Sequence, residues 1–394
     1  MSQVWLMLQA AGATMLLLFG IVKHWIPEFS LDSKYQIVVN WGVISIISVA
    51  GARALLMGLL RWLNANGHGQ GRVVIVGLSE MAIGAAAKLN ASPWSGLQIA
   101  GYVDDRATPR FYAAGDYLTR LGAVKDLPDI VHNERIEQVW VCFSLREEER
   151  TREVVEILKH ETVNIRLVID CYSFKAAPLS GSMNTVSGIP ALDISVSPLD
   201  GINWYVKEIE DRGLALLILM LLAPLMALIA LGVKLSSPGP VFYRQERVGW
   251  NNRCFMMLKF RSMPVNAEAK TGPVWAKPNE NRATRFGAFL RKTSLDELPQ
   301  LINVLRGEMS LVGPRPERPQ FVDRFKDQVP HYMKKHMVKA GITGWAQVNG
   351  WRGDTDLNKR IEHDLYYIQH WSLWFDLVIA MKTLYSGMVN KNAY

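Results

Sequence analysis

Residues 214–233 read LALLILMLLAPLMALIALGV, an uncharged stretch long enough to reach across a bilayer. Pro224 lies at its middle, where it removes a helix hydrogen bond and bends the chain. Basic residues flank the stretch on both sides: Lys207 and Arg212 before it, and Lys234, Arg244 and Arg247 after it. A spanning helix is basic mainly at one end, so both ends are expected to face the cytoplasm. The pattern predicts a re-entrant helix over 213–235 with its break at Pro224, and a proline-kinked transmembrane helix is the alternative.

Two further apolar segments lie ahead of this stretch. Residues 4–22 carry no charge, and Met1-Ser2-Gln3 lacks the basic residue that a signal peptide has there. Residues 37–60 are a second bilayer-length candidate. The loop between them has balanced charges, from Lys23, Glu28, Asp32 and Lys34. The positive-inside rule therefore predicts a transmembrane helical hairpin over 1–66, with its loop outside and both ends in the cytoplasm.

Residues 67–171 change to alternating strands and helices. The run Arg72–Gly77 is typical of a buried strand, and further strand-like runs follow at 99–103, 138–143 and 164–169. This order predicts a parallel, doubly wound, Rossmann-like sheet. The first turn, 77–84, lacks the middle glycine of G-x-G-x-x-G. A structural or regulatory domain is therefore favoured over a dinucleotide site, which stays open.

The remaining residues form a connector and a last domain. Residues 172–210 are rich in Ser, Pro and Gly and are read as a connector that includes a strand-like run at 191–196. Residues 211–394 are read as a mostly helical domain that contains the apolar stretch. The predicted fold class is therefore an α/β membrane protein, with N-terminal transmembrane helices, a Rossmann-like parallel α/β domain and a C-terminal, mostly helical domain with a re-entrant membrane helix.

Composition limits the functional classes. The net charge of +8 suits anionic lipid, a phosphorylated substrate or nucleic acid. No zinc-finger spacing or RNA-binding aromatic motif is present, so we expect no nucleic-acid partner. Cys142, Cys171 and Cys254 are far apart and form no CxxC, which indicates reduced thiols in a reducing compartment. No H-E-x-x-H is present, so a zinc site is not expected.

The stretch Ser294-Leu295-Asp296-Glu297 opens what reads as an amphipathic helix, with Arg291 just before it. Further on, Gly313-Pro314-Arg315-Pro316 is a rigid turn that carries another guanidinium. Acid pairs among cations are what chemistry on a pyrophosphate needs, as nucleophile or metal ligand. The alternative is structural, because Ser294 and Glu297 have the spacing of a capping box. The two interpretations are compatible, because the capped start of a helix is also an anion-binding site.

Two other segments carry candidate binding residues. Lys259 and Arg261 flank Phe260 and add two cations. The glycine-containing loop 341–350 suits a sugar or base, which its aromatic side chain and amides would contact, although a plain turn-rich connection is the alternative. Its candidate contacts are Thr343, Trp345, Gln347 and Asn349. Residues 370–378 put Trp371, Trp374, Phe375 and Val378 on one helical face, either in a core or at a membrane interface.

Taken together, these motifs resemble one family. The chain is similar to the large bacterial phosphoglycosyl transferases of the monotopic superfamily, in particular to undecaprenyl-phosphate glucose phosphotransferases, over nearly its whole length. The resemblance is carried by separated motifs in family order: residues 237–242 (SPGPVF), 259–263 (KFRSM), 293–298 (TSLDEL), 310–316 (SLVGPRP) and 341–350. Each motif alone is weak, and the set is highly specific.

The resemblance implies an activity. Such enzymes move a hexose-1-phosphate, here glucose-1-phosphate by overall likeness, from a UDP-sugar to undecaprenyl phosphate and release UMP, which begins exopolysaccharide or capsule repeat units. It implies that Asp296 is the nucleophile of a phosphosugar-aspartyl intermediate and that Glu297 is its partner, with Mg²⁺, or Mn²⁺, at Asp296 and Glu297. Arg291, Arg315, Lys259 and Arg261 are the implied phosphate-binding residues. The implied partners are the UDP-sugar, undecaprenyl phosphate, membrane lipids and, as an option, a second copy in a homodimer.

The same resemblance implies a location in the cell, and two alternative functions are weighed against it. The expected location is the bacterial inner membrane, with the catalytic domain on its cytoplasmic face. Relatives of this size usually have four transmembrane helices and often Ser-Pro at the re-entrant break, whereas this chain has two candidates and Ala223-Pro224. A membrane-tethered nucleotide-sugar dehydratase or epimerase is one rival, but it needs G-x-G-x-x-G and a Tyr-x-x-x-Lys dyad, which the Rossmann-like region lacks. A non-catalytic scaffold for polysaccharide assembly is the other.

Overall fold

The computed structural model describes residues 71–92, 95–106, 118–144, 146–169, 185–186, 188–265, 283–353 and 355–389, with scattered helical positions between 36 and 58. The first predicted transmembrane segment lies outside these residues. The described positions of the second are helical and mostly exposed. The transmembrane hairpin over 1–66 therefore stays a prediction.

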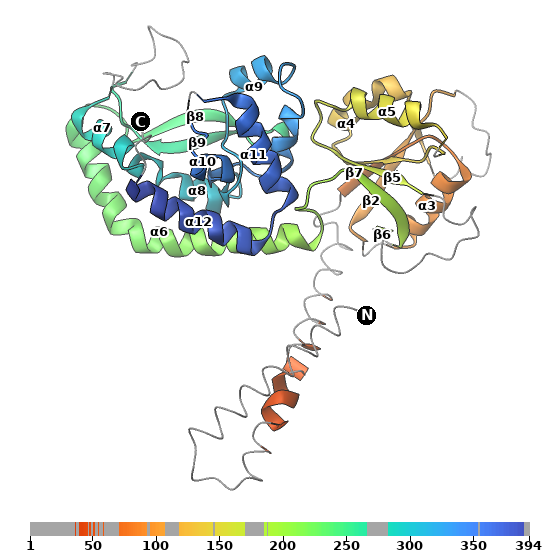
Figure 1. The fold of residues 1–394 in the computed structure, drawn as a ribbon, viewed down its shortest axis with the longest axis horizontal. Coiled ribbons are helices and arrows are strands. Elements are labelled where there is room, and N and C mark those ends of the chain that lie inside the picture. Colours follow the sequence, from red (N-terminus) through yellow and green to blue (C-terminus); the bar gives the residue numbers. More distant parts are fainter. Residues whose placement is uncertain are drawn as a thin grey trace. The chain divides into compact units, whose positions relative to one another are not determined.

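The predicted parallel sheet is present (Figure 1). Its elements are β1 (Gly71–Val76), α3 (Glu80–Asn90), β2 (Leu97–Val103), β3 (Arg120–Gly122), a 3₁₀ turn η3 (Val124–Asp126), α4 (Leu127–Asn133), β4 (Ile136–Val141), α5 (Glu148–Ile157), β5 (Asn164–Val168), β6 (Thr185–Val186) and β7 (Ile189–Ser195). The strand order is β3-β2-β1-β4-β5-β7-β6, with β1, β4 and β5 parallel. Val73, Val74 and Ile75 are fully buried, as expected of a sheet that is covered on both faces.

One edge of the sheet differs from the expectation. Residues 172–210 were read as a connector with a strand-like run at 191–196. That run overlaps β7, but β7 belongs to the sheet, where it pairs antiparallel with β5, and β6 pairs antiparallel with β7. The register pairs Arg166 of β5 with Asp193 of β7, and the two side chains form an ion pair of 2.9 Å. The ion pair fixes this edge, and it joins residues too far apart in sequence for a local pattern to reveal it.

The C-terminal domain is mostly helical around short strands (Figure 1). Its elements are α6 (Ile202–Ser236), β8 (Phe242–Val248), η4 (Trp250–Asn252), β9 (Cys254–Phe260), α7 (Arg285–Lys292), η5 (Leu295–Glu297), α8 (Gln300–Leu305), β10 (Ser310–Val312), α9 (Pro319–Phe325), η6 (Tyr332–Met337), β11 (Gly341–Thr343), α10 (Trp345–Val348), α11 (Leu357–Gln369) and α12 (Leu373–Val389). β8 and β9 form an antiparallel hairpin, and β10 and β11 form a parallel pair.

The apolar stretch forms a single helix. α6 runs from Ile202 to Ser236 with Pro224 inside it, and it is the one described helix long and apolar enough to cross a membrane. The sequence predicted a break at Pro224, but the helix is uninterrupted there and instead curves toward α7 (Figure 1). Proline removes one backbone hydrogen bond, which bends a helix without ending it when the side chains on both sides are packed.

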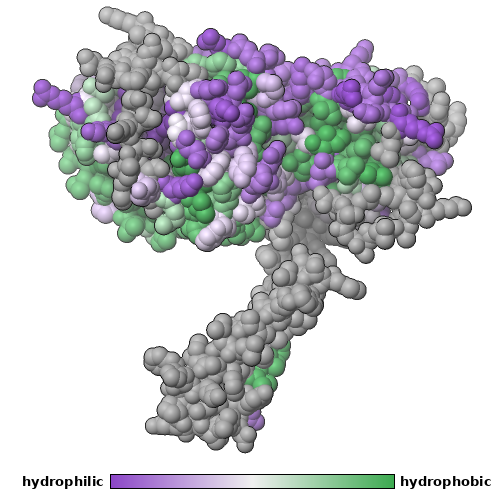
Figure 2. All heavy atoms as spheres, viewed as in Figure 1, coloured by the Kyte–Doolittle hydropathy of each residue, from purple (hydrophilic) through white to green (hydrophobic). Residues whose placement is uncertain are grey.

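Both halves of α6 pack on the C-terminal domain. Before Pro224, Ala215 is buried with Leu301, Val304 and Met309. After Pro224, a second cluster joins α6 to β9 and α7: Ile229, Val233, Phe260 and Leu290. The opposite face of α6 is exposed and apolar, with Leu217, Met220, Leu221, Leu228, Leu231 and Leu235 between 58% and 79% exposed. Figure 2 shows hydrophobic residues gathered along the edge of the domain where Figure 1 places α6.

Candidate active site

The acid pair lies in a tight turn rather than in a capped helix. α7 ends at Lys292, Ser294 has a left-handed backbone (φ 55°), and Asp296 and Glu297 follow in the 3₁₀ turn η5. The Ser294 side chain accepts no capping hydrogen bond. The capping-box interpretation was therefore wrong, because a left-handed residue cannot aim its hydroxyl at the N–H groups of the next turn.

Three cations converge on one oxygen of Glu297. Its Oε1 lies 2.8 Å from Lys259 Nζ, 2.9 Å from Arg315 Nη2 and 3.5 Å from Arg352 Nη2. The Glu297 side chain is only 10% exposed, and its Oε2 makes no hydrogen bond or ion pair within the described part of the chain. Glu297 is therefore the counterion that holds these cations together.

The charges around Glu297 decide its ionisation. Burial alone would raise the pKa of Glu297, but Arg315, Lys259 and Arg352 outweigh burial and hold the pKa well below its usual range. Burial lowers the pKa of Lys259, with Arg315 adding to this effect and Glu297 opposing it. Glu297 therefore stays a carboxylate under all ordinary conditions.

Asp296 has the opposite surroundings. It is 8% exposed, and among the described residues it makes no hydrogen bond or ion pair. Burial is the main cause that raises the pKa of Asp296, and the negative charge of Glu297 adds to it; Lys259, Arg352 and Arg291 act against the rise. An unpaired carboxylate beside a cationic cluster is available to a phosphorus atom in a way that Glu297 is not.

Arg315 is held by the two parallel strands β10 and β11. The turn after β10 is closed by hydrogen bonds from Gly313 N to Thr343 O and from Gly341 N to Pro314 O, both 2.8 Å. A Cβ on Gly341 would lie 2.1 Å from Gly313 N, so only glycine permits this close approach. Arg315 Nη1 also donates to Gln347 Oε1 at 3.1 Å. The glycines thus place Arg315 and Gln347 together beside Glu297.

The other two predicted phosphate-binding residues differ in their relation to the acid pair. Arg291 is in the last turn of α7 and acts electrostatically on Asp296. Arg261 points elsewhere: its guanidinium donates to Ser237 O at 2.6 Å and Pro238 O at 2.7 Å, next to the end of α6. Within the described residues, Arg261 therefore holds the loop after α6 and makes no contact with the acid pair.

The loop 341–350 is divided between the site and the core. Gln347 reaches Arg315, whereas Thr343 Oγ1 lies 2.6 Å from Thr383 Oγ1 of α12. The Trp345 ring packs with Phe375 at 5.0 Å between centroids, in the cluster that α11 and α12 form. Asn349 Nδ2 donates to Trp345 O at 2.8 Å. Gln347 is thus the loop residue that the structure joins to the acid pair.

Sequence reasoning missed two arginines. Arg352 contacts Glu297, and Arg247 donates to Pro316 O at 3.1 Å. Burial, with Arg315 and Arg318 adding to it, lowers the pKa of Arg247 to about 10. Arg352 lies two residues after Gly350, the end of the predicted binding loop, and its positive charge there could have indicated a phosphate-binding role. For Arg247 no signal existed, because it lies on a strand far from the acid pair in sequence.

A divalent cation fits the oxygens that remain. Mg²⁺ binds through one or two carboxylates together with substrate phosphates. Asp296 and Glu297 Oε2 are unused among the described residues, and a diphosphate would supply the other oxygens. The described residues hold no cluster of three or more metal-binding side chains, so the protein alone offers at most a partial ligand set.

The first turn of the Rossmann-like domain is filled. Gly77 has φ +86°, and a Cβ there would lie 2.5 Å from the Phe143 ring, which Arg150 covers at 4.3 Å from its centroid. The acid at the end of β2, Asp104, accepts from Leu78 N at 2.9 Å. In dinucleotide-binding domains, the pyrophosphate and ribose use these places. The described residues therefore favour the structural interpretation of this domain.

Comparisons with known proteins identify the family of this chain. A model of the bacterial sugar transferase family matches residues 202–390, and a model named CoA-binding domain matches residues 1–168. A UDP-glucose:undecaprenyl-phosphate glucose-1-phosphate transferase of Xanthomonas campestris pv. campestris is 41% identical over 90% of this chain and 74% of its own length. A protein of the same name from Escherichia coli (strain K12) is 37% identical over 92% and 77%.

A third relative differs in its sugar. An undecaprenyl-phosphate galactose phosphotransferase of Salmonella typhimurium is 32% identical over 92% of this chain and 76% of its own length. The match to residues 202–390 covers α6, the acid pair, Arg315 and Arg352, and it confirms the resemblance found in the motifs. The chain therefore belongs to the bacterial sugar transferase family.

Proposed function

We propose that this chain transfers glucose-1-phosphate from UDP-glucose to undecaprenyl phosphate and releases UMP. The names of two relatives that match most of the chain supply the substrates. The observation that carries the proposal is the acid pair, in which Glu297 is neutralised by three cations and Asp296 has no ion-pair partner among the described residues. Such a site takes an anionic diphosphate and offers one nucleophile.

Two displacements account for the reaction. In the first, an Asp296 carboxylate oxygen bonds to the β-phosphorus of UDP-glucose, the bond between the β-phosphorus and the bridging oxygen breaks, and UMP leaves with the electron pair. In the second, a phosphate oxygen of undecaprenyl phosphate bonds to the same phosphorus, and the bond to Asp296 breaks. The carboxylate is restored, and the product is undecaprenyl-diphosphate-glucose.

The cations and Glu297 have different tasks in these steps. Lys259, Arg315 and Arg352 neutralise the phosphoryl oxygens as charge builds up, while Glu297 keeps them in place before the substrate arrives. Gln347 fixes the second guanidinium nitrogen of Arg315. Mg²⁺, held by Asp296, Glu297 and the diphosphate, would supply further neutralisation of charge on the phosphates.

The proposal includes a one-sided attachment to the membrane. Both halves of α6 pack on the C-terminal domain while their outer face is apolar, which supports a re-entrant helix on the cytoplasmic face of the inner membrane. α12 adds a second exposed stripe, formed by Leu373, Trp374, Leu377, Met381 and Tyr385. Tryptophan and tyrosine are enriched at membrane interfaces, so the stripe suits lipid headgroups beside α6.

The test is UMP release with a panel of UDP-sugars and undecaprenyl phosphate in detergent. UMP formation with UDP-glucose, faster than with UDP-galactose, supports the proposal. A faster reaction with UDP-galactose would mean that the transferred sugar is galactose, and the proposed chemistry would stand. No UMP with any UDP-sugar, from protein that is folded by circular dichroism, would overturn it.

A further inference from the structure

Arg315 depends on a strand that is too short to hold itself. β10 has three residues, Ser310–Val312, and leads directly into the turn that carries Arg315. Its partner β11 binds one side of it, with Ser310 N donating to Ala340 O at 2.8 Å. Within the strand, Ser310 Oγ also donates to Val312 O at 2.7 Å. The other partners of Leu311 N and Val312 O come from other elements, and they help to decide where Arg315 lies.

Side chains from two helices bind those backbone groups. Leu311 N donates to Asp211 Oδ1 of α6 at 3.0 Å. The Tyr367 hydroxyl of α11 lies 3.0 Å from Val312 O and 2.9 Å from Asp376 Oδ1 of α12. β10 is therefore held from α6 at one residue and from the α11–α12 pair at the next.

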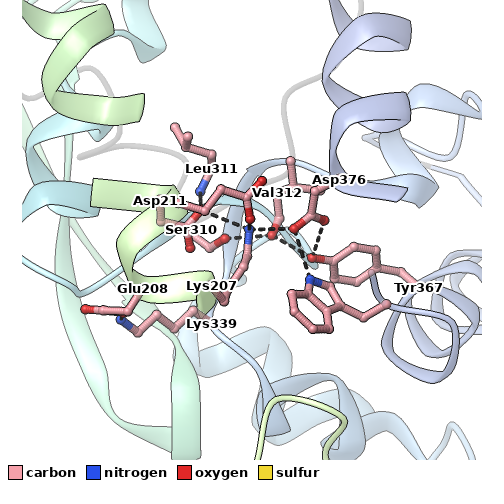
Figure 3. A network of polar contacts seen from close by, with 11 residues as sticks. Lys207, Glu208, Asp211, Ser310, Leu311, Val312, Lys339, Tyr367 and Asp376 are labelled. Atoms are coloured by element: carbon pink, nitrogen blue, oxygen red, sulfur yellow. Dashed lines mark hydrogen bonds and ion pairs between the residues drawn. The ribbon is translucent and has the colours of Figure 1, made fainter. Parts of the chain in front are cut away.

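Lys207 joins the two sides (Figure 3). Its Nζ lies 2.9 Å from Asp211 Oδ1 and 2.8 Å from Asp376 Oδ2, and Figure 3 shows it pointing between the two carboxylates. The side chains of Lys207, Asp211 and Asp376 are 6%, 2% and 1% exposed. Trp371 Nε1 donates to Asp376 Oδ2 at 3.0 Å, and Glu210 Oε2 lies 3.6 Å from Lys207 Nζ.

A buried network of this kind is sensitive to each member. When one member of such a network is removed, the groups that it paired with lose part of their compensation, and the surrounding structure shifts to reach water or another partner. Here the atoms that would shift include the backbone of Leu311 and Val312, four and three residues before Arg315. A charge change on α6 or α12 is thereby transmitted to the phosphate-binding turn.

We infer that Lys207, Asp211 and Asp376 are positioning residues, which fix Arg315 toward the substrate phosphates through β10. The inference rests on the proposed function, because it assigns Arg315 to the sugar nucleotide. It also links the membrane to the site. α6 and α12 carry the two exposed apolar faces, so their seating in lipid and the position of Arg315 share one network.

The experiment is a double-mutant cycle on kcat/KM for UDP-glucose, with Asp376→Asn, Arg315→Lys and the double variant in the full chain. Asp376→Asn is expected to lower kcat/KM at least about tenfold in the native background. In the Arg315→Lys background the same change is expected to cost less than about twofold, because the group that it positions is already altered. If the fold-losses in kcat/KM of the two single variants multiply in the double variant, the inference is overturned.

A matched control uses the same turn of α6. Glu208 pairs with Lys339 and Arg212 and contacts no backbone atom of β10. Glu208→Gln is expected to combine multiplicatively with Arg315→Lys, since a merely structural loss is independent of Arg315. Coupling as strong as that of Asp376→Asn would show a general loss of packing and would also overturn the inference.

A replacement variant and the activity of the native protein keep the possible outcomes distinguishable. If Asp376→Asn fails to fold, Tyr367→Phe takes its place in the cycle, because it removes only the hydroxyl beside Val312 and Asp376. If the native protein releases no UMP from any UDP-sugar, the proposed function itself fails. If the native protein is active and the losses multiply, only the positioning role fails.

Discussion

Asp296 and Glu297 are neighbours in sequence with opposite surroundings. Glu297 is paired with three cations and keeps its charge, whereas Asp296 has no ion-pair partner among the described residues and burial raises its pKa. In the proposed mechanism this difference separates their roles: Glu297 assembles the cations, and Asp296 is the group that reacts.

We expect Asp296→Asn to abolish transfer while the protein folds and enters the membrane. An amide has nearly the same shape but is not a nucleophile, so the rate should fall by at least about a thousandfold, or roughly 4 kcal/mol. Without a lipid acceptor, labelled UDP-glucose should leave label on the native protein and none on the variant. Asp323→Asn, which alters an exposed aspartate, is the control. A variant that keeps several per cent of the rate would remove Asp296 from its role.

Glu317 gives a prediction for acid stability. Burial opposes its ionisation, but Lys335, Tyr332 and Arg360 lower its pKa to about 2. A depressed carboxyl pKa contributes stability that is fully present above the usual value, near 4.5, and is lost as pH falls toward 2; this shift corresponds to about 3 kcal/mol. The Tm difference between native protein and Glu317→Gln should therefore be constant above about pH 5.5 and shrink below it. A difference that does not change between pH 7 and pH 3.5 would contradict this.

At the scale of elements, the sequence predicted those with a strong local pattern. The run that follows Arg72, Val73–Val76, is continuously apolar and became most of the buried strand β1, and the uncharged stretch 214–233 became most of α6. The strand-like run 191–196 overlaps β7, whereas β6 was missed because a strand of two residues has no continuous apolar run. The capping box failed because residue spacing does not reveal the sign of φ at Ser294.

The candidate site was predictable in part for the same reason. Asp296, Glu297 and Arg315 belong to recognisable motifs, and the structure brings Glu297 and Arg315 together. Arg352 and the network around Lys207 depend on contacts between distant elements, which no local pattern records.

For α6 we expect one-sided topology. Ser236 at its end and the exposed Cys254 both follow the helix, so both should be inaccessible from outside the cell. The measurement is labelling of Ser236→Cys, and separately of Cys254, with a membrane-impermeant maleimide on intact cells, with Cys171 replaced by serine. Permeabilised cells provide the positive control. External labelling of either site would mean that the helix spans the bilayer. Pro224→Ala should straighten α6 and produce such labelling in part of the population.

For α12 we expect contact with lipid along its exposed stripe. A spin label at Met381→Cys, 60% exposed in the structure, should be more accessible to oxygen than to a water-soluble nickel complex in vesicles. Glu362→Cys on α11, in a charged and exposed setting, is the matched control and should show the reverse. Equal accessibility at the two positions would place α12 in water.

At the scale of the whole molecule, activity brings the two carboxylates of the acid pair next to anionic substrates. Transfer should stop with EDTA and return with Mg²⁺ or Mn²⁺, because the acid pair and a diphosphate repel one another without a bridging cation. The measurement is UMP release after metal removal and after titration with each metal. Full activity in metal-free buffer would leave Lys259, Arg315 and Arg352 as the sole source of neutralisation.

The attachment of both halves of α6 to one domain has a mechanical consequence for the bilayer. A helix that enters a single leaflet adds area to that leaflet and none to the other, so it acts as a wedge. Such a wedge is accommodated best where the lipids of its own leaflet are spread apart. The protein should therefore partition more strongly into small, highly curved vesicles than into large, flat ones, and should itself favour bending of the membrane toward its own side.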